Sequence, residues 1–165
     1  MDAITAMTTR RSIRQYKKEP VRPEDLETIL NCGRLAPTGV NRQAWKFIVA
    51  TEQAVKEKVA QATDYGKFVS TAAVVIAVAV GPDCVCPNED SAAATCNMLN
   101  AAHALGYGGC WIGANGNATA ERVGKVLGLP AGWRIMSVFS VGVPAGPATR
   151  EKKPLEEVVS YNHFE

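Results

Sequence analysis

The densest group of chemically useful side chains lies near the start of the chain, in the string RRSIR at residues 10–14. Three guanidinium groups and a hydroxyl within five residues offer the bidentate donors that bind phosphate or carboxylate groups. A second cationic string, REKK, occupies residues 150–153. Each string by itself could be a solvated surface face. If the fold brings the two strings together, they would converge on one anion.

A second candidate region is the polar, turn-rich segment APTGVNRQAW at residues 36–45. It carries amide and hydroxyl groups and ends on an aromatic residue, immediately before an expected strand. Loops of this composition often hold the hydrogen-bonding edges of a planar ligand. The same groups could instead satisfy local backbone atoms, with Trp45 filling the core. Composition leaves both interpretations open.

A third region is the glycine-rich segment GYGGCWIGANG at residues 106–116, where the backbone can approach a ligand closely. Its glycines miss the G-x-G-x-x-G spacing of a dinucleotide fingerprint, and the segment before them has a helical pattern where that fingerprint needs a strand. A P-loop is excluded as well, because no Gly-Lys pair has both the upstream glycine and the following hydroxyl. The segment therefore predicts an accessible backbone surface without a standard phosphate motif.

Metal and nucleophile chemistry find little support. Cys84 and Cys86 form a C-x-C pair, but the gaps to the other cysteines match no zinc or iron–sulfur pattern, so no metal is expected. There is no G-x-S-x-G motif. His103 lies on an apolar helix stripe, where a core role is the usual one, and His163 is close to the chain end. An anion clamp, a hydrogen-bonding loop and a glycine-rich backbone suit a protein whose cofactor carries the chemistry.

Length and composition limit the class of protein. The chain has 165 residues, 47% apolar and 21% charged, with a net charge of +2. We expect one domain over residues 1–165 that needs no disulfide or metal to fold. The charge is too small for a nucleic-acid partner, and the longest apolar run is too short for a membrane span. The first residues have the wrong order for a secretory signal, so a cytoplasmic location is expected.

The elements that position the three regions are intermixed helices and strands. A short helix is expected after Asp2 that ends at the basic string 10–14. Further helices are expected over residues 23–35, 52–62, 89–105 and 119–127, and strands over residues 45–50, 71–80, 108–112 and 135–143. The run at 71–80 lacks polar alternation, which predicts a strand buried on both faces at the sheet centre. Asp2 and Thr119 are expected to cap their helices, and Gly106 is expected to end one. This pattern indicates a mixed α and β protein.

Four motifs in this order resemble the nitroreductase family of FMN-dependent oxidoreductases. They are RRSIRQY at residues 10–16, APTGVNRQAWKF at 36–47, the helix from 90 that leads to GYGGCWIG at 106–113, and REKKPL at 150–155. The resemblance spans nearly the whole chain. It implies an α+β sandwich with a central mixed, mostly antiparallel sheet flanked by helices. It also implies an intertwined homodimer with two FMN sites at the interface.

The resemblance further implies which residues meet the flavin. The residues implied for the phosphate, the ribityl chain and the pyrimidine edge are Arg10, Arg11, Ser12, Arg14, Arg150 and Lys152. Those implied to come from the partner chain are Pro37, Thr38, Gly39, Asn41 and Gln43. The stretch whose backbone faces flavin N5 would be Ile112, Gly113 and Ala114. No side chain would be catalytic itself, and Arg14 and Gly113 would tune the flavin.

The implied activity is hydride transfer from NAD(P)H to flavin N5 and then to a nitroaromatic, quinone or similar acceptor, in a ping-pong cycle. Gly113 departs from the glutamate that several relatives carry there, and the chain is short where larger relatives carry insertions that shape the substrate pocket. One alternative is another flavin reaction on the same fold, such as dehalogenation or ene reduction. Another is a flavin store or redox sensor without turnover, in which Cys84 and Cys86 would respond.

Overall fold

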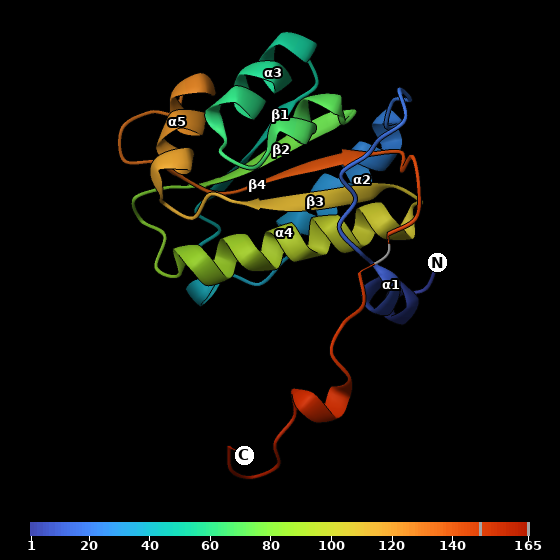
Figure 1. Ribbon diagram of the computed structural model, residues 1–165. Helices are drawn as coiled ribbons and strands as arrows, with labels where there is room; N and C mark the ends of the chain where they lie inside the picture. The colour runs from blue at the N-terminus through green and yellow to red at the C-terminus, as the bar shows by residue number, and fades with distance from the viewer. Residues whose placement is uncertain (149, 165) are drawn as a thin grey trace.

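The computed structural model describes residues 1–148 and 150–164. At its centre is a four-stranded sheet with the strand order β1-β2-β4-β3. The strands are β1 (Trp45–Ala50), β2 (Val74–Val80), β3 (Gly108–Gly113) and β4 (Arg134–Gly142). All three neighbouring pairs of strands are antiparallel. The α+β sandwich that the resemblance implied is confirmed (Figure 1).

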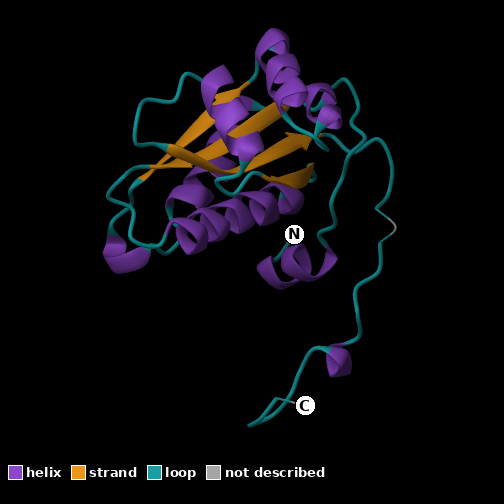
Figure 2. Ribbon diagram, turned by 60° about the vertical axis from the view of Figure 1, so that its left-hand side comes forward, coloured by secondary structure: helices purple, strands orange, loops and turns teal. Residues whose placement is uncertain are grey.

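Helices cover both faces of this sheet (Figures 1 and 2). They are α1 (Ala3–Thr9), α2 (Pro23–Arg34), α3 (Gln53–Ala62), α4 (Pro87–Ala104) and α5 (Ala118–Val126). The α3 and α5 helices pack on one face, and α2 and α4 pack on the other. The short α1 helix lies beside the end of α4. None of the helices in the described part of the chain has the length and apolar character needed to cross a membrane.

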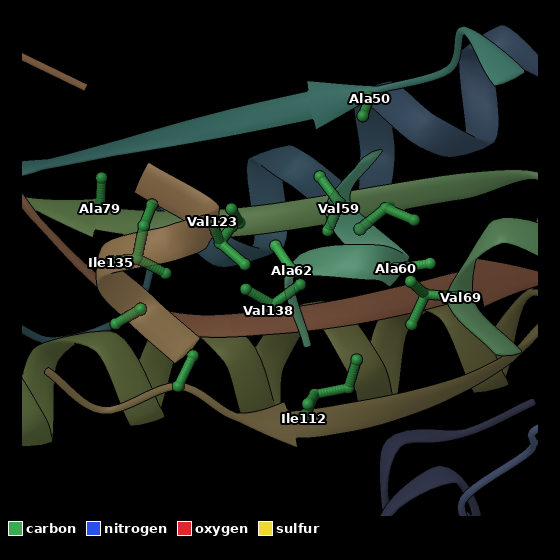
Figure 3. Packing of buried hydrophobic residues seen from close by; sticks show 14 residues of the cluster. Ala50, Val59, Ala60, Ala62, Val69, Ala79, Ile112, Val123, Ile135 and Val138 are labelled. Carbon is green, nitrogen blue, oxygen red and sulfur yellow. The ribbon is translucent and has the colours of Figure 1, made fainter. Parts of the chain in front are cut away.

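The β2 strand is buried along its whole length, as its unbroken apolar sequence predicts. Its alternate residues point to opposite faces, so Ala77 joins the cluster under α3 and α5, whereas Ile76 joins the cluster under α2 and α4. Figure 3 shows the first cluster, in which Val59 and Val123 from the helices pack over Val138 of β4. These two apolar layers hold the edge strand β3 in a fixed position relative to the helices.

Several helix ends follow their local signals. Asp2 caps α1 as predicted, because its carboxylate accepts a hydrogen bond from the Thr5 N–H at 3.0 Å. Gly106 follows the last turn of α4 with a φ of 92°, a conformation that glycine adopts without strain. The chain can therefore turn directly from α4 into β3.

Two predictions about element ends are wrong. The strand expected from residue 71 begins at Val74, because the 3-10 turn Lys67–Thr71 precedes it. The α5 helix is capped by Asn117 and not by Thr119, whose hydroxyl instead donates to Asp64 at 2.9 Å. In the first case, the 3-10 turn occupies the start of the expected strand. In the second case, the Asp64 carboxylate accepts the hydrogen bond of the Thr119 hydroxyl.

Candidate functional site

A pocket of about 410 Å³ lies where two distant parts of the chain meet. Residues 10–15 line one side, and residues 146–148, Arg150 and Lys152 line the other. Arg11 and Arg150 are 139 positions apart in the sequence, yet the Arg11 Nε donates to the Arg150 carbonyl at 3.1 Å. The structure therefore brings together six of the predicted residues, which are Arg10, Arg11, Ser12, Arg14, Arg150 and Lys152.

Backbone pairing with the sheet holds the arginine segment in place. Ser12 forms a parallel bridge with Gly109 of β3, and the Ile13 N–H donates to the Gly109 carbonyl at 2.9 Å. Tyr16 forms an antiparallel bridge with Pro144, just after β4. Because both bridges connect to the sheet, the arginine segment and the segment after β4 share one rigid support.

Two glycines at the start of β3 allow this close approach. A Cβ atom at Gly108 would lie 2.6 Å from Ile13 Cγ1, and one at Gly109 would lie 2.7 Å from the Ser140 carbonyl oxygen. Real Cβ atoms essentially never make contacts this short, so neither position tolerates a side chain without movement. The sequence suggested that these glycines expose backbone to a ligand. In the structure, the absence of side chains at these glycines lets Ile13 and the β4 backbone pack closely against β3.

The cations around the pocket have no acidic partner in the part of the chain that the structure describes. Within residues 1–148 and 150–164, all ion pairs lie elsewhere, as between Arg122 and Asp64. No carboxylate lines the pocket among these residues. The pocket cations that form no ion pair among the described residues are those of Arg10, Arg11, Arg14, Arg150 and Lys152. Unpaired positive charges that face one hollow create a strong local field for an anion.

The arginines of the pocket differ in how they are held. The Arg11 Nη1 donates to the carbonyls of Thr8 and Arg10, both at 2.9 Å, so Arg11 braces the end of α1 against the C-terminal segment. The Arg14 guanidinium lies over the Phe68 ring, 5.9 Å from its centroid, in a cation–π arrangement. The Arg10 side chain forms no hydrogen bond within the described residues, so its donors are free for a ligand.

The polar loop at residues 37–43 lies far from this pocket. The Gly39 N–H donates to Asp90 Oδ1 at 2.9 Å, near the start of α4. The arginine segment instead lies near the end of α4, where Thr9 contacts His103. The helix between Asp90 and His103 is roughly 20 Å long at ~1.5 Å per residue. Within one chain, the structure therefore does not bring the loop to the pocket, and this applies to Pro37, Thr38, Gly39, Asn41 and Gln43.

This loop has an uncommon backbone conformation. Val40, Asn41 and Gln43 have φ values of 46°, 54° and 51°, in the left-handed region that favours glycine. The Gln43 N–H donates to Thr38 Oγ1 at 3.2 Å, and the Gln43 side chain donates to Asn41 Oδ1 at 3.2 Å. Some polar groups of the loop therefore form hydrogen bonds within the loop itself, which is the alternative to ligand binding. Backbone strain of this kind tends to concentrate at functional sites.

The third predicted group lies at the far end of β3. Ile112 and Ala114 are buried, whereas Gly113 is exposed, and a Cβ atom at Gly113 would meet no atom within 4 Å. About 13 Å of strand separate Gly113 from Gly109, where Ser12 pairs. Since β3 is an edge strand, no strand among the described residues pairs with its outer side at Gly113. An open edge thus leads from the arginine pocket to Gly113.

His103 does not line the pocket, but it contacts Thr9, the residue before Arg10, which its place on an apolar helix stripe did not predict. Its Nε2 lies 2.8 Å from Thr9 Oγ1, at the end of α1. Burial, followed by the charges of Arg10 and Arg11, lowers the pKa of the imidazole. Only the packing of α1 against α4 shows this proximity, because nothing in the local sequence links residue 9 to residue 103.

Comparisons with known proteins agree with this architecture. The model of the nitroreductase family matches residues 7–73 and 62–143. A protein of Archaeoglobus fulgidus, provisionally named NADH dehydrogenase/NAD(P)H nitroreductase, is 34% identical over 149 residues, which cover 87% of this chain and 86% of that protein. A crystal structure from Bacteroides thetaiotaomicron with the same provisional name has a TM-score of 0.93 at 29% identity, covering 98% of each chain. An FMN-dependent nitroreductase from Clostridium difficile has a TM-score of 0.91 at 25% identity, covering 98% of this chain and 99% of its own.

Proposed function

The chain belongs to the nitroreductase family of oxidoreductases, and from this premise we propose that it is an FMN-dependent enzyme that transfers hydride from NAD(P)H to a nitroaromatic, quinone or similar acceptor. One observation carries the proposal. Cations from two distant parts of the chain line one pocket, without an acidic partner among the described residues. Such a pocket suits the phosphate of a cofactor.

The side chains of the pocket fit the phosphate end of FMN. A phosphate monoester carries up to two negative charges and needs charge-assisted donors, which guanidinium groups supply in pairs. Arg10 has donors without a hydrogen-bond partner among the described residues, and the exposed Arg150 and Lys152 approach from the opposite side. These three side chains would hold the phosphate, while Arg11 keeps the two segments together.

FMN, when bound, supplies the hydride-transfer chemistry, and the protein groups bind and orient it. Ser12 would donate to or accept from the ribityl hydroxyls. Arg14 would place a permanent positive charge near the pyrimidine edge, where it favours negative charge on the ring. Gly113, which has open space at its Cβ position, would present backbone and leave room for an acceptor.

A second copy of the chain would complete this site. Residues 37–43 lie at the other end of α4 from the pocket of their own chain, so only a partner chain can bring them to the flavin. Large exposed apolar side chains support an interface. Leu155 and Phe164 of the C-terminal segment are 70% and 100% exposed, and Ile4 and Met7 on α1 are 67% and 54% exposed. Figure 1 shows the C-terminal segment extending away from the sheet, where it could pack against a second chain.

Purification and anaerobic reduction test the proposal. The protein should be yellow and dimeric, with one FMN per chain. Under anaerobic conditions NADH or NADPH should bleach the flavin absorbance, and nitrofurazone or menadione should restore it. A colourless monomer that takes up no FMN would overturn the proposal.

The same experiment separates an enzyme from a flavin store or sensor. A store would keep its colour after NAD(P)H is added. The sensor alternative needs reactive thiols, but burial and then the hydrogen bond to Asp90 raise the pKa of Cys84. Because the thiolate is the reactive form, this environment disfavours Cys84 as a sensor and favours the enzyme. An acceptor screen with nitroaromatic, quinone, halogenated and enone compounds would distinguish the possible reactions.

A further inference from the structure

The contact between His103 and Thr9 joins the rigid helix α4 to the residues that begin the pocket. Thr9 is the last residue of α1, and Arg10 follows it directly. His103 lies in the last turn of α4, which packs against the sheet. The family resemblance implies no role for His103 in flavin binding, and the proposed function does not use it.

The hydrogen bonds of Thr9 determine which imidazole nitrogen carries the proton. Thr9 Oγ1 lies 2.6 Å from the Thr5 carbonyl oxygen and 2.8 Å from His103 Nε2. A hydroxyl has one hydrogen, and a carbonyl oxygen has none to offer. The hydroxyl must therefore donate to Thr5, because two oxygens this close repel without a hydrogen between them. It follows that His103 Nε2 carries a hydrogen and donates it to Thr9.

The α1 helix depends on such a contact because it is short and weakly buried. It has seven residues, of which only Ala6 is buried, and a helix of this length is not stable alone. Beyond Thr9, the Arg11 Nη1 donates back to the Thr8 carbonyl. The Thr9 hydroxyl thus links residues 8–11 to α4 by a side-chain hydrogen bond, in addition to the packing of α1 on α4.

We propose that His103 is a positioning residue of the anion pocket, which donates from Nε2 to Thr9 and thereby orients Arg10 toward the phosphate of the ligand and keeps Arg11 in contact with the Arg150 carbonyl. This inference rests on the proposed function in one respect, since it takes FMN as the ligand. His103 itself would touch neither the phosphate nor the reacting atoms.

The charges near the ring give this contact a pH dependence. Burial lowers the pKa of the His103 imidazole, and the charged groups that act on it, Arg10 and Arg11, lower it further, so the neutral ring is favoured. An anion in the pocket offsets the two arginine charges and so favours the imidazolium. By linkage, protonation of His103 then strengthens anion binding. The protonated ring still carries its Nε2 hydrogen, so the bond to Thr9 is kept.

Flavin binding to His103 variants tests the proposal. His103→Leu removes the donor, and His103→Gln keeps an N–H at a similar position. His163→Leu is the matched control, because it changes the other histidine of the chain, which lies in the exposed C-terminal segment. The dissociation constants of FMN and of riboflavin, which lacks the phosphate, are measured by fluorescence after bound flavin is removed by dialysis.

We expect His103→Leu to weaken FMN binding about tenfold and to leave riboflavin binding unchanged, while His103→Gln and His163→Leu stay near wild type at pH 8. The ratio of wild-type to His103→Gln affinity for FMN should rise severalfold between pH 8 and pH 6. Thr9→Val, which removes the acceptor, should match His103→Leu and covers the case in which that variant does not fold.

Three results would overturn the proposal. One is an unchanged preference for FMN over riboflavin in both His103→Leu and Thr9→Val. Another is an equal loss of affinity for both flavins, which would indicate a general structural role. The third is a pH-independent ratio of wild-type to His103→Gln affinity. If wild type itself binds FMN no more tightly than riboflavin, the phosphate site of the proposed function fails instead.

Discussion

Replacing Arg10 by alanine should weaken FMN binding without destabilising the fold, whereas replacing Arg11 should mainly destabilise the fold. The reason lies in their hydrogen bonds. The Arg10 side chain has no hydrogen-bond partner within the described residues, but Arg11 donates to three backbone carbonyls. Two adjacent arginines therefore have different roles, and each of the two variants serves as the matched control for the other.

The sizes of the two effects follow from these contacts. One charge-assisted contact to phosphate contributes about 1.5–3 kcal/mol, so Arg10→Ala should raise the dissociation constant of FMN by roughly 10- to 150-fold. Its free energy of unfolding should change by no more than about 0.5 kcal/mol, as for a surface substitution. Arg11→Ala loses three hydrogen bonds that water replaces in part, so we expect a loss of about 1–3 kcal/mol.

Two measurements check this prediction. Urea unfolding of the flavin-free protein gives the free energy of unfolding, and fluorescence titration gives the affinities for FMN and riboflavin. Arg10→Ala should affect FMN and not riboflavin, since only FMN carries the phosphate. The reasoning fails if Arg10→Ala binds FMN like wild type, or if Arg11→Ala unfolds at the wild-type urea concentration.

Three further predictions concern stability and are measured by urea unfolding. Gly109→Ala would place a Cβ 2.7 Å from a carbonyl oxygen of β4 and should cost about 1–3 kcal/mol; wild-type stability would contradict the close packing. Gly113→Ala, in the same strand, meets no atom and should stay within about 0.5 kcal/mol of wild type, and a larger loss would show that the space is filled. The hydrogen bonds from Arg22 and then Tyr107 hold the pKa of Asp25 below its ordinary value. The ionised carboxylate therefore stabilises the fold fully above about pH 4, and this stabilisation is lost as the pH falls through the lowered pKa. Asp25→Asn should therefore lose less stability at pH 3 than at pH 7, and equal losses would exclude this titration.

Most of the elements could be predicted because their signals are local. The apolar run that contains β2 indicated a central, doubly buried strand, and the structure places it between β1 and β4. Asp2 and Gly106 mark helix ends through their own side-chain chemistry or backbone freedom. Thr119 failed as a cap because Asp64, 55 positions away, competes for its hydroxyl. Local signals are reliable only where no distant group offers a better partner.

The candidate site shows the same division. The residue types in RRSIR and REKK indicated an anion-binding role, since guanidinium and ammonium groups have few other uses at such density. Their order along the chain also carried the family resemblance. The sequence could not show that Arg11 links the end of α1 to the C-terminal segment or that His103 contacts Thr9, next to the pocket residue Arg10. Both depend on how α1 packs against α4 and on the path of the segment after β4.

The sequence by itself determined the kinds of groups available, the helices and strands, and the family to which the chain belongs. Only the tertiary structure decided which groups meet. It joined residues 10–15 to residues 146–148, Arg150 and Lys152 through the edge of β3 and the segment after β4, and it separated the loop at 37–43 from them by most of the length of α4. The physical reason is that composition and periodicity depend on neighbours a few residues apart. The pocket depends instead on strand pairing and helix packing between residues more than ninety positions apart.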